Sequence, residues 1–235
     1  MRFLIISKRM VAIISILLAL LIVASIFLTI SNKSKEVFYE DIYYKGTKNE
    51  KIIAFVCNID WGNEYIQEML DIFKKNDIRI SFFPTGRWAE KNPELVKTIR
   101  SYNHEIGNHG YNHLDYSKLS YDKNYEEISR AGKVIEDIIG EKLKFFAPPS
   151  GAFNDNTVKA AKDLDYKIIM WSIDTIDWRE DSTKELIVNR VVGKIDESAI
   201  VLMHPTANTV KALPDIINYL FKNDYKIGTI GDIIN

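Results

Sequence analysis

The chain has 235 residues, a formal net charge of −1 and 46% hydrophobic residues. After an apolar N-terminus, about two hundred residues remain, which is enough for one domain with a full core. The near-neutral charge, with no long basic run after the N-terminal segment, argues against a nucleic-acid partner. The single cysteine, Cys57, excludes an intramolecular disulfide and a cysteine-rich metal site.

The N-terminal segment is predicted to anchor the chain in a membrane. Residues Met10–Ile30 carry no charge, and about 20 such residues span a bilayer. Arg2, Lys8 and Arg9 precede the run and favour a cytoplasmic N-terminus over residues 1–9. A cleaved signal peptide is the alternative, but its apolar region is usually only about 7–15 residues long and ends at a small-residue cleavage site. Both readings place the following domain outside the cytoplasm.

Residues 31–50 are polar and tyrosine-rich and are interpreted as a linker, and residues 51–235 as one domain. Short apolar runs bounded by turn residues predict strands. These runs cover residues 52–58, 79–85, 104–110, 144–148, 167–173, 199–204 and 225–230. Amphipathic segments between them predict helices at 63–76, 92–102, 121–140, 154–164, 183–194 and 210–223.

This alternation predicts an α/β fold, a distorted (β/α) barrel of about seven parallel strands preceded by one transmembrane helix. In such barrels the chemistry lies at the carboxyl ends of the strands. Polar residues follow four different predicted strands at that end: Asn58, Asp60, His109, His113, Asp174, Asp177 and His204. The sequence therefore predicts that these side chains share one site.

His109 and His113 lie four residues apart in NHGYNH. Two imidazoles at this spacing can converge on one metal ion if the segment turns helically. The alternative is a pair of loop histidines that hydrogen-bond to the backbone. With three of the four histidines at predicted strand ends, the metal-ligand interpretation gains weight.

His204 ends an apolar run and is either a hydrogen-bonded core residue or a general acid or base. Asp177 ends the neighbouring predicted strand, and a carboxylate bonded to an imidazole fixes its tautomer and raises its basicity. The alternative for Asp174 and Asp177 is helix capping or a turn.

Asn58 and Asp60 share one face of an extended segment, so both can face the site. The alternative for Asp60 is an Asx turn ahead of the next helix. Trp61 and Trp178 are candidates for the walls of a sugar-binding groove, although buried tryptophans in a core are equally ordinary.

With these residues in place, residues 51–235 resemble the NodB-homology polysaccharide deacetylases, carbohydrate esterase family 4. The resemblance implies a distorted barrel and a divalent metal, usually zinc, that assists removal of acetyl groups from N-acetylated sugars. HGYNH implies His109 and His113 as metal ligands. DTIDW implies that Asp177 tunes the catalytic histidine, with Trp178 beside it. LMH implies Leu202 as a wall of the acetyl pocket and His204 as the general acid.

Two motifs depart from the family pattern. The first motif normally has two adjacent aspartates, of which the first is the base and the second a metal ligand. In one alignment these positions are Asn58 and Ile59. In the other, shifted by two residues, they are Asp60 and Trp61. Asp60 is thus the candidate base, with a role as metal ligand left open. The third motif normally begins with an arginine that orients the base, and Ala147 stands there. Its backbone turn is kept, so the Ser150 amide can contribute to an oxyanion hole.

The segments DWG, GRWAEKNPELV and EIGNHGYNH resemble the sporulation-type, membrane-anchored members of the family. We therefore expect a metal-dependent hydrolase that removes N-acetyl groups from a cell-wall polysaccharide, with peptidoglycan amino sugars as substrate. The alternative is a catalytically impaired protein of the same fold that binds wall glycan without turnover. A purely structural membrane protein would leave the clustered polar residues unexplained.

Overall fold

The computed structural model describes residues 9, 17–22, 25, 41–48 and 50–234. Most of the predicted anchor, residues 10–30, lies outside this part of the chain. Within the described residues, no helix has both the length and the apolar character needed to cross a membrane. The chain divides into two units, Met1–Glu40 and Asp41–Asn235, and the second contains every strand of the described part.

The described strands form two sheets, and every strand pair is parallel, as predicted. The larger sheet has the order β4-β3-β2-β8-β7, with β9 also paired to β2. Its strands are β2 (Ile52–Ile59), β3 (Ser81–Pro84), β4 (Glu105–Ile106), β7 (Ile173–Asp174), β8 (Ile200–Met203) and β9 (Lys226–Gly228). The smaller sheet has the order β1-β6-β5 and consists of β1 (Ile42–Tyr43), β5 (Phe145–Phe146) and β6 (Lys167–Ile169).

The two sheets connect into a distorted ring. A parallel bridge between Asn108 and Phe146 joins the segment after β4 to β5. On the other side, the chain from β6 to β7 crosses between the sheets: the Met170 N–H donates to Tyr43 O, and the Ser172 N–H donates to Ile200 O. The single strand predicted over 167–173 is therefore wrong, because the segment changes partners midway. Part of the predicted linker also pairs in a sheet, as β1.

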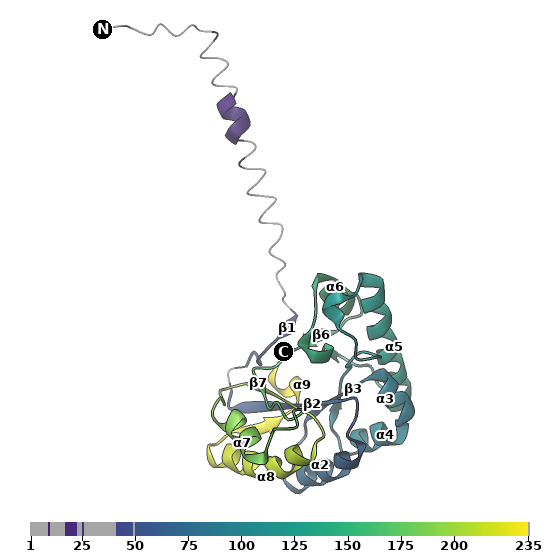
Figure 1. Ribbon diagram of the computed structural model, residues 1–235, viewed down its shortest axis with the longest axis vertical. Coiled ribbons are helices and arrows are strands. Elements are labelled where there is room, and N and C mark those ends of the chain that lie inside the picture. Colours follow the sequence, from purple (N-terminus) through teal and green to yellow (C-terminus); the bar gives the residue numbers. More distant parts are fainter. Residues whose placement is uncertain (1–8, 10–16, 23–24, 26–40, 49, 235) are drawn as a thin grey trace, which may run out of the picture. The chain divides into compact units, whose positions relative to one another are not determined.

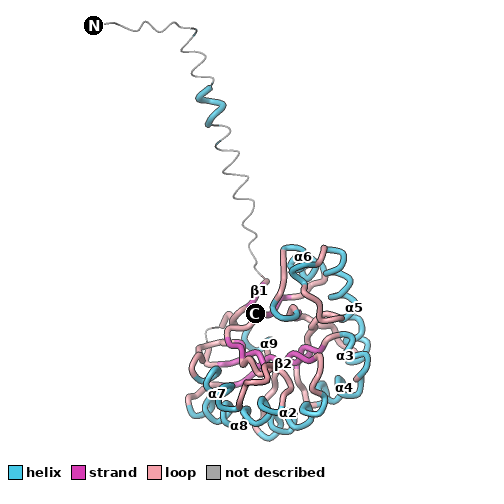
Figure 2. Tube along the Cα trace, in the orientation of Figure 1, coloured by secondary structure: helices cyan, strands magenta, loops and turns pink. Residues whose placement is uncertain are grey.

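Helices run round the outside of the strands (Figure 2). They are α2 (Asn63–Lys75), α3 (Gly86–Lys91), α4 (Pro93–Ser101), α5 (Tyr121–Ile139), α6 (Asp155–Asp163), α7 (Lys184–Val192), α8 (Ala207–Lys222) and α9 (Ile230–Ile233). Six of them match the predicted helices within a few residues. The short helices α3 and α9 were not predicted, and α3 proves important for the site.

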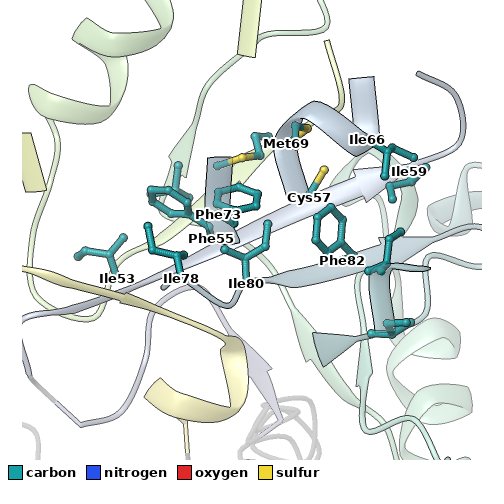
Figure 3. Packing of buried hydrophobic residues seen from close by; sticks show 14 of the residues in the cluster. Ile53, Phe55, Cys57, Ile59, Ile66, Met69, Phe73, Ile78, Ile80 and Phe82 are labelled. Atoms are coloured by element: carbon teal, nitrogen blue, oxygen red, sulfur yellow. The ribbon is translucent and has the colours of Figure 1, made fainter. Parts of the chain in front are cut away.

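Strand β2 lies in the interior next to β3 and orients the site residues (Figure 1). Every second side chain of β2 points toward α2 and packs in the main core (Figure 3). These residues are Ile53, Phe55, Cys57 and Ile59. The intervening positions face the inside of the ring. This alternation carries Asn58 and then Asp60 into the cavity at the carboxyl end of the sheet.

Candidate active site

A cavity of about 410 Å³ lies at the carboxyl ends of the strands. Its lining residues lie at or after the carboxyl ends of β2, β4, β5, β6, β7 and β8. They are Asn58, Asp60, Trp61, His109, His113, Ser150, Trp171, Asp174, Trp178, Leu202 and His204. Every predicted site residue is in this set except Asp177, which lies behind His204. The structure thus brings together the residues that the strand-end pattern grouped.

His109 and His113 face each other, with ring centroids 5.2 Å apart and ring planes at 73°. The Nδ1 atom of buried His109 lies 2.7 Å from the Ala147 carbonyl oxygen, which can only accept, so Nδ1 carries the proton. Its Nε2 atom therefore keeps a lone pair. Burial, reinforced by the charge of His113, lowers the pKa of His109 to about 3 and keeps the ring neutral. This is the form in which imidazole binds metal ions or accepts hydrogen bonds.

The loop that carries His113 is held from two helices. Glu127, buried on α5, accepts hydrogen bonds from the backbone N–H and the side-chain amide of Asn112, both at 2.8 Å. From α3, the Gly86 N–H donates to Gly110 O at 2.8 Å. These contacts make the histidine pair a preorganised feature of the cavity.

Asp177 and His204 form the hydrogen-bonded pair that their strand-end positions predicted. Asp177 Oδ1 lies 2.8 Å from His204 Nδ1, and its other oxygen accepts from the His204 backbone N–H at 2.7 Å and from Thr209 Oγ1 at 2.6 Å. Asp177 is only 4% exposed. The carboxylate therefore places the proton of neutral His204 on Nδ1 and fixes the orientation of the ring.

Asp60 also reaches the cavity, but both of its oxygens are already engaged. One accepts from Thr85 Oγ1 at 2.6 Å and from Arg87 Nε at 3.0 Å, and the other accepts from Arg87 Nη2. Burial alone would raise the pKa of Asp60, but the hydrogen bonds and positive charge of Arg87, with help from Thr85, lower it below its ordinary value. Arg87, from α3, was not among the predicted site residues.

Aromatic side chains wall the cavity mouth. The ring of Trp61 lies parallel to that of His204, with centroids 6.1 Å apart and planes at 8°. Trp61 is 45% exposed and Trp178 is 56% exposed. Trp171 is a half-buried third tryptophan of the lining that was not predicted. Exposed flat rings beside a polar cavity are suited to stacking on the apolar faces of sugars.

Leu202 and Ser150 occupy the predicted positions in the lining. Leu202, at 3% exposure, presents a buried apolar surface to the cavity. Ser150 has a left-handed backbone with φ of 56°, inside the tight turn Pro149–Gly151. Such conformations cost energy and concentrate at functional sites. The oxyanion role of its amide stays a prediction.

Asn58 holds a polar atom without a partner. The residue is 3% exposed and lines the cavity, and its side-chain carbonyl oxygen makes no hydrogen bond within the described part of the chain. A buried unpaired acceptor costs about 1–3 kcal/mol. This oxygen has almost no solvent-accessible surface, so the unpaired acceptor is a cost within the fold.

Replacing Asn58 with leucine, which has a similar shape, is expected to stabilise the protein. The free energy of unfolding should rise by about 1–2 kcal/mol because the unpaired acceptor is removed. Urea denaturation followed by circular dichroism measures this change. An unchanged or lower stability would show that the Asn58 oxygen is satisfied in solution.

The residues do not complete the metal-ligand set that the resemblance implies. A catalytic zinc site ordinarily has three protein ligands and one open position. His109 and His113 supply two, Asp60 is bonded to Arg87 and Thr85, and Trp61 offers no carboxylate. Within the described residues, there is no group of three or more His, Cys, Asp or Glu side chains placed to hold a metal ion. We therefore derive no catalytic step through a metal.

The parallel α/β fold and the strand-end site define the chain as a member of the polysaccharide deacetylase family, carbohydrate esterase family 4. The profile described as "Polysaccharide deacetylase" matches residues 45–169, just over half of the chain. Among curated proteins, YlxY of Bacillus subtilis (strain 168), described as uncharacterized, is 38% identical over 192 residues. The match covers 82% of this chain and 60% of YlxY, so the chain spans less than two thirds of this relative.

Two further relatives differ in their described activity. A peptidoglycan-N-acetylglucosamine deacetylase of Bacillus cereus is 36% identical, covering 82% of this chain and 92% of that protein. The crystal structure of BA3943, a CE4 family pseudoenzyme from Bacillus anthracis, aligns with a TM-score of 0.79 and 40% identity over 82% of this chain and 68% of that one. A structure of a BA3943 mutant, described as having restored enzymatic activity, aligns equally well. The chain is thus similar to active and inactive members alike.

Proposed function

We propose that the domain binds N-acetylated cell-wall glycan in the cavity and that its deacetylase activity is impaired. The observation that carries this proposal is the missing third metal ligand. No third acidic or histidine ligand accompanies His109 and His113 in the described residues, and Trp61 follows Asp60 where the family motif has a second carboxylate. The wall of tryptophans and the apolar surface of Leu202 remain available for a ligand. The ligand we propose is the amino sugar of peptidoglycan.

Hydrolysis of N-acetyl groups is the second candidate. It is favoured by the hydrogen bond between His204 and Asp177, which prepares the imidazole for proton transfer to a leaving amine. In this case Asp60 would be the proton acceptor, and a divalent ion, expected to be zinc, would have to rely on His109 and His113. Both candidates place the same glycan in the same cavity.

We also propose a cellular location for the domain. The uncharged run at 10–30 and the basic residues before it support a single-pass anchor with an extracytoplasmic C-terminal domain. The resemblance to sporulation-type deacetylases supports a role in the cell wall of a spore-forming bacterium. Under this proposal the partners are the membrane and the wall glycan.

Binding to a tetramer of N-acetylglucosamine, followed by isothermal titration calorimetry, tests the main candidate. Trp178→Ala is expected to weaken binding about tenfold, because an exposed ring at the cavity mouth would lose its contact with a sugar. Phe221→Ala is the matched control, since Phe221 is 45% exposed but lies on α8 outside the cavity lining. Equal affinities for both variants and the unmodified protein would contradict the assigned binding surface.

A further inference from the structure

Arg87 makes a two-point hydrogen-bonded ion pair with the carboxylate of Asp60, which lines the cavity. Its Nε and Nη2 atoms donate to different oxygens of Asp60, and Thr85 Oγ1 adds a third hydrogen bond. Such two-point contacts fix the plane of a carboxylate, whereas a single contact leaves it free to rotate. The Arg87 side chain is 45% exposed and that of Asp60 only 13%, so a half-exposed guanidinium is bonded to a largely buried carboxylate.

The backbone of Arg87 is fixed relative to the histidine loop. At the start of α3, Thr85 caps the helix by accepting from the Trp88 N–H at 3.3 Å. The Arg87 N–H donates to Tyr111 O at 3.2 Å, within the segment that joins His109 to His113. Arg87 therefore ties the end of β2 to the loop that carries both imidazoles.

Stability alone does not explain this pair. The guanidinium is 45% exposed, so solvent screens part of the attraction. The chain has another arginine–carboxylate pair, between Arg100 and Glu141, in which one nitrogen contacts both oxygens. What distinguishes the Arg87 pair is its place, since its carboxylate lines the cavity. Ala147, which stands where the resemblance expects an arginine, has no group that can orient Asp60.

We propose that Arg87 is a positioning residue of the glycan site and acts through Asp60. It holds the Asp60 carboxylate in the orientation in which it accepts a sugar hydroxyl. Helix α3 thus supplies a guanidinium that the turn after β5 lacks. This inference rests on the proposed glycan binding, and it predicts that Arg87 and Asp60 contribute to affinity as one unit.

A double-mutant cycle tests this unit. Arg87→Met and Asp60→Asn are each expected to weaken binding of the N-acetylglucosamine tetramer about tenfold, and the double variant should be no weaker than either single one. Arg87→Lys should recover only part of the loss, because an ammonium cannot make the two-point contact. Arg100→Met, which breaks an arginine–carboxylate pair outside the cavity lining, should bind as the unmodified protein does.

Additive losses in the double variant would overturn the inference, because Arg87 would then contact the glycan independently. Unchanged affinity in Arg87→Met would overturn it as well. If the unmodified protein binds no glycan, the proposed function fails, and carbon-13 NMR of the carboxyl groups still tests the positioning. The groups that act on Asp60 are Arg87, Thr85, His113 and His109. Arg87→Met should raise the pKa of Asp60, and an unchanged titration would show that Arg87 does not control this carboxylate.

Discussion

Replacing Trp61 with aspartate is expected to create a zinc site, raising the affinity of the protein for Zn²⁺ by about 100-fold or more. Trp61 follows Asp60 directly and lines the same cavity as His109 and His113. The variant would add a second carboxylate beside the two imidazoles, next to Asp60, which is bonded to Arg87 and Thr85. Two neutral imidazoles and one carboxylate form a common three-ligand zinc set.

Trp61→Asn is the matched control, because it removes the same ring without adding a charge and should leave zinc affinity nearly unchanged. Competition with a chromophoric chelator measures both affinities. Adding His109→Ala to the aspartate variant should abolish the gain. Tight zinc binding by the unmodified protein, equal to that of Trp61→Asp, would show that the site is already complete.

Gly62→Ala is expected to destabilise the protein by about 3–5 kcal/mol. Gly62 has a left-handed backbone, with φ of 83°, at the N-cap of α2. A Cβ atom there would lie 2.2 Å from the Pro205 carbonyl oxygen, and backbone cannot give way as a flexible side chain can. The substitution therefore forces apart the segments that carry Trp61 and His204. Chemical denaturation measures the loss of unfolding free energy.

Gly140 provides the control for backbone strain. It has a similar φ of 75° at the C-cap of α5, but an added Cβ would meet nothing within 4 Å. Gly140→Ala should therefore cost only about 1 kcal/mol. Similar costs at the two glycines would mean that the contact between Gly62 and Pro205 does not constrain the site.

The polar residues at the strand ends predicted most of the site. Parallel strands deliver their carboxyl ends to one edge, so residues such as His109 and His204 converge although 95 positions separate them. Period-two alternation in β2 likewise placed Asn58 and Asp60 on the cavity side. These predictions rest on local periodicity, which a single sequence contains.

The missed features depend on tertiary contacts. Arg87 resembles any exposed helical arginine in the sequence, and its contact with Asp60 appears only once β2 and α3 are packed together. The run 167–173 reads as one strand because most of its residues are apolar, but its hydrogen-bond partners change from Tyr43 to Ile200. Periodicity cannot reveal such a change of partner.

The most direct test of impaired deacetylation measures glycan binding and acetate release on the same sample. The purified protein, with excess Zn²⁺, is mixed with peptidoglycan fragments that carry N-acetyl groups. We expect saturable binding without acetate release above the level of a His204→Ala control. Repeated turnover with stoichiometric acetate release, abolished by His204→Ala, would contradict it and establish the protein as an active deacetylase.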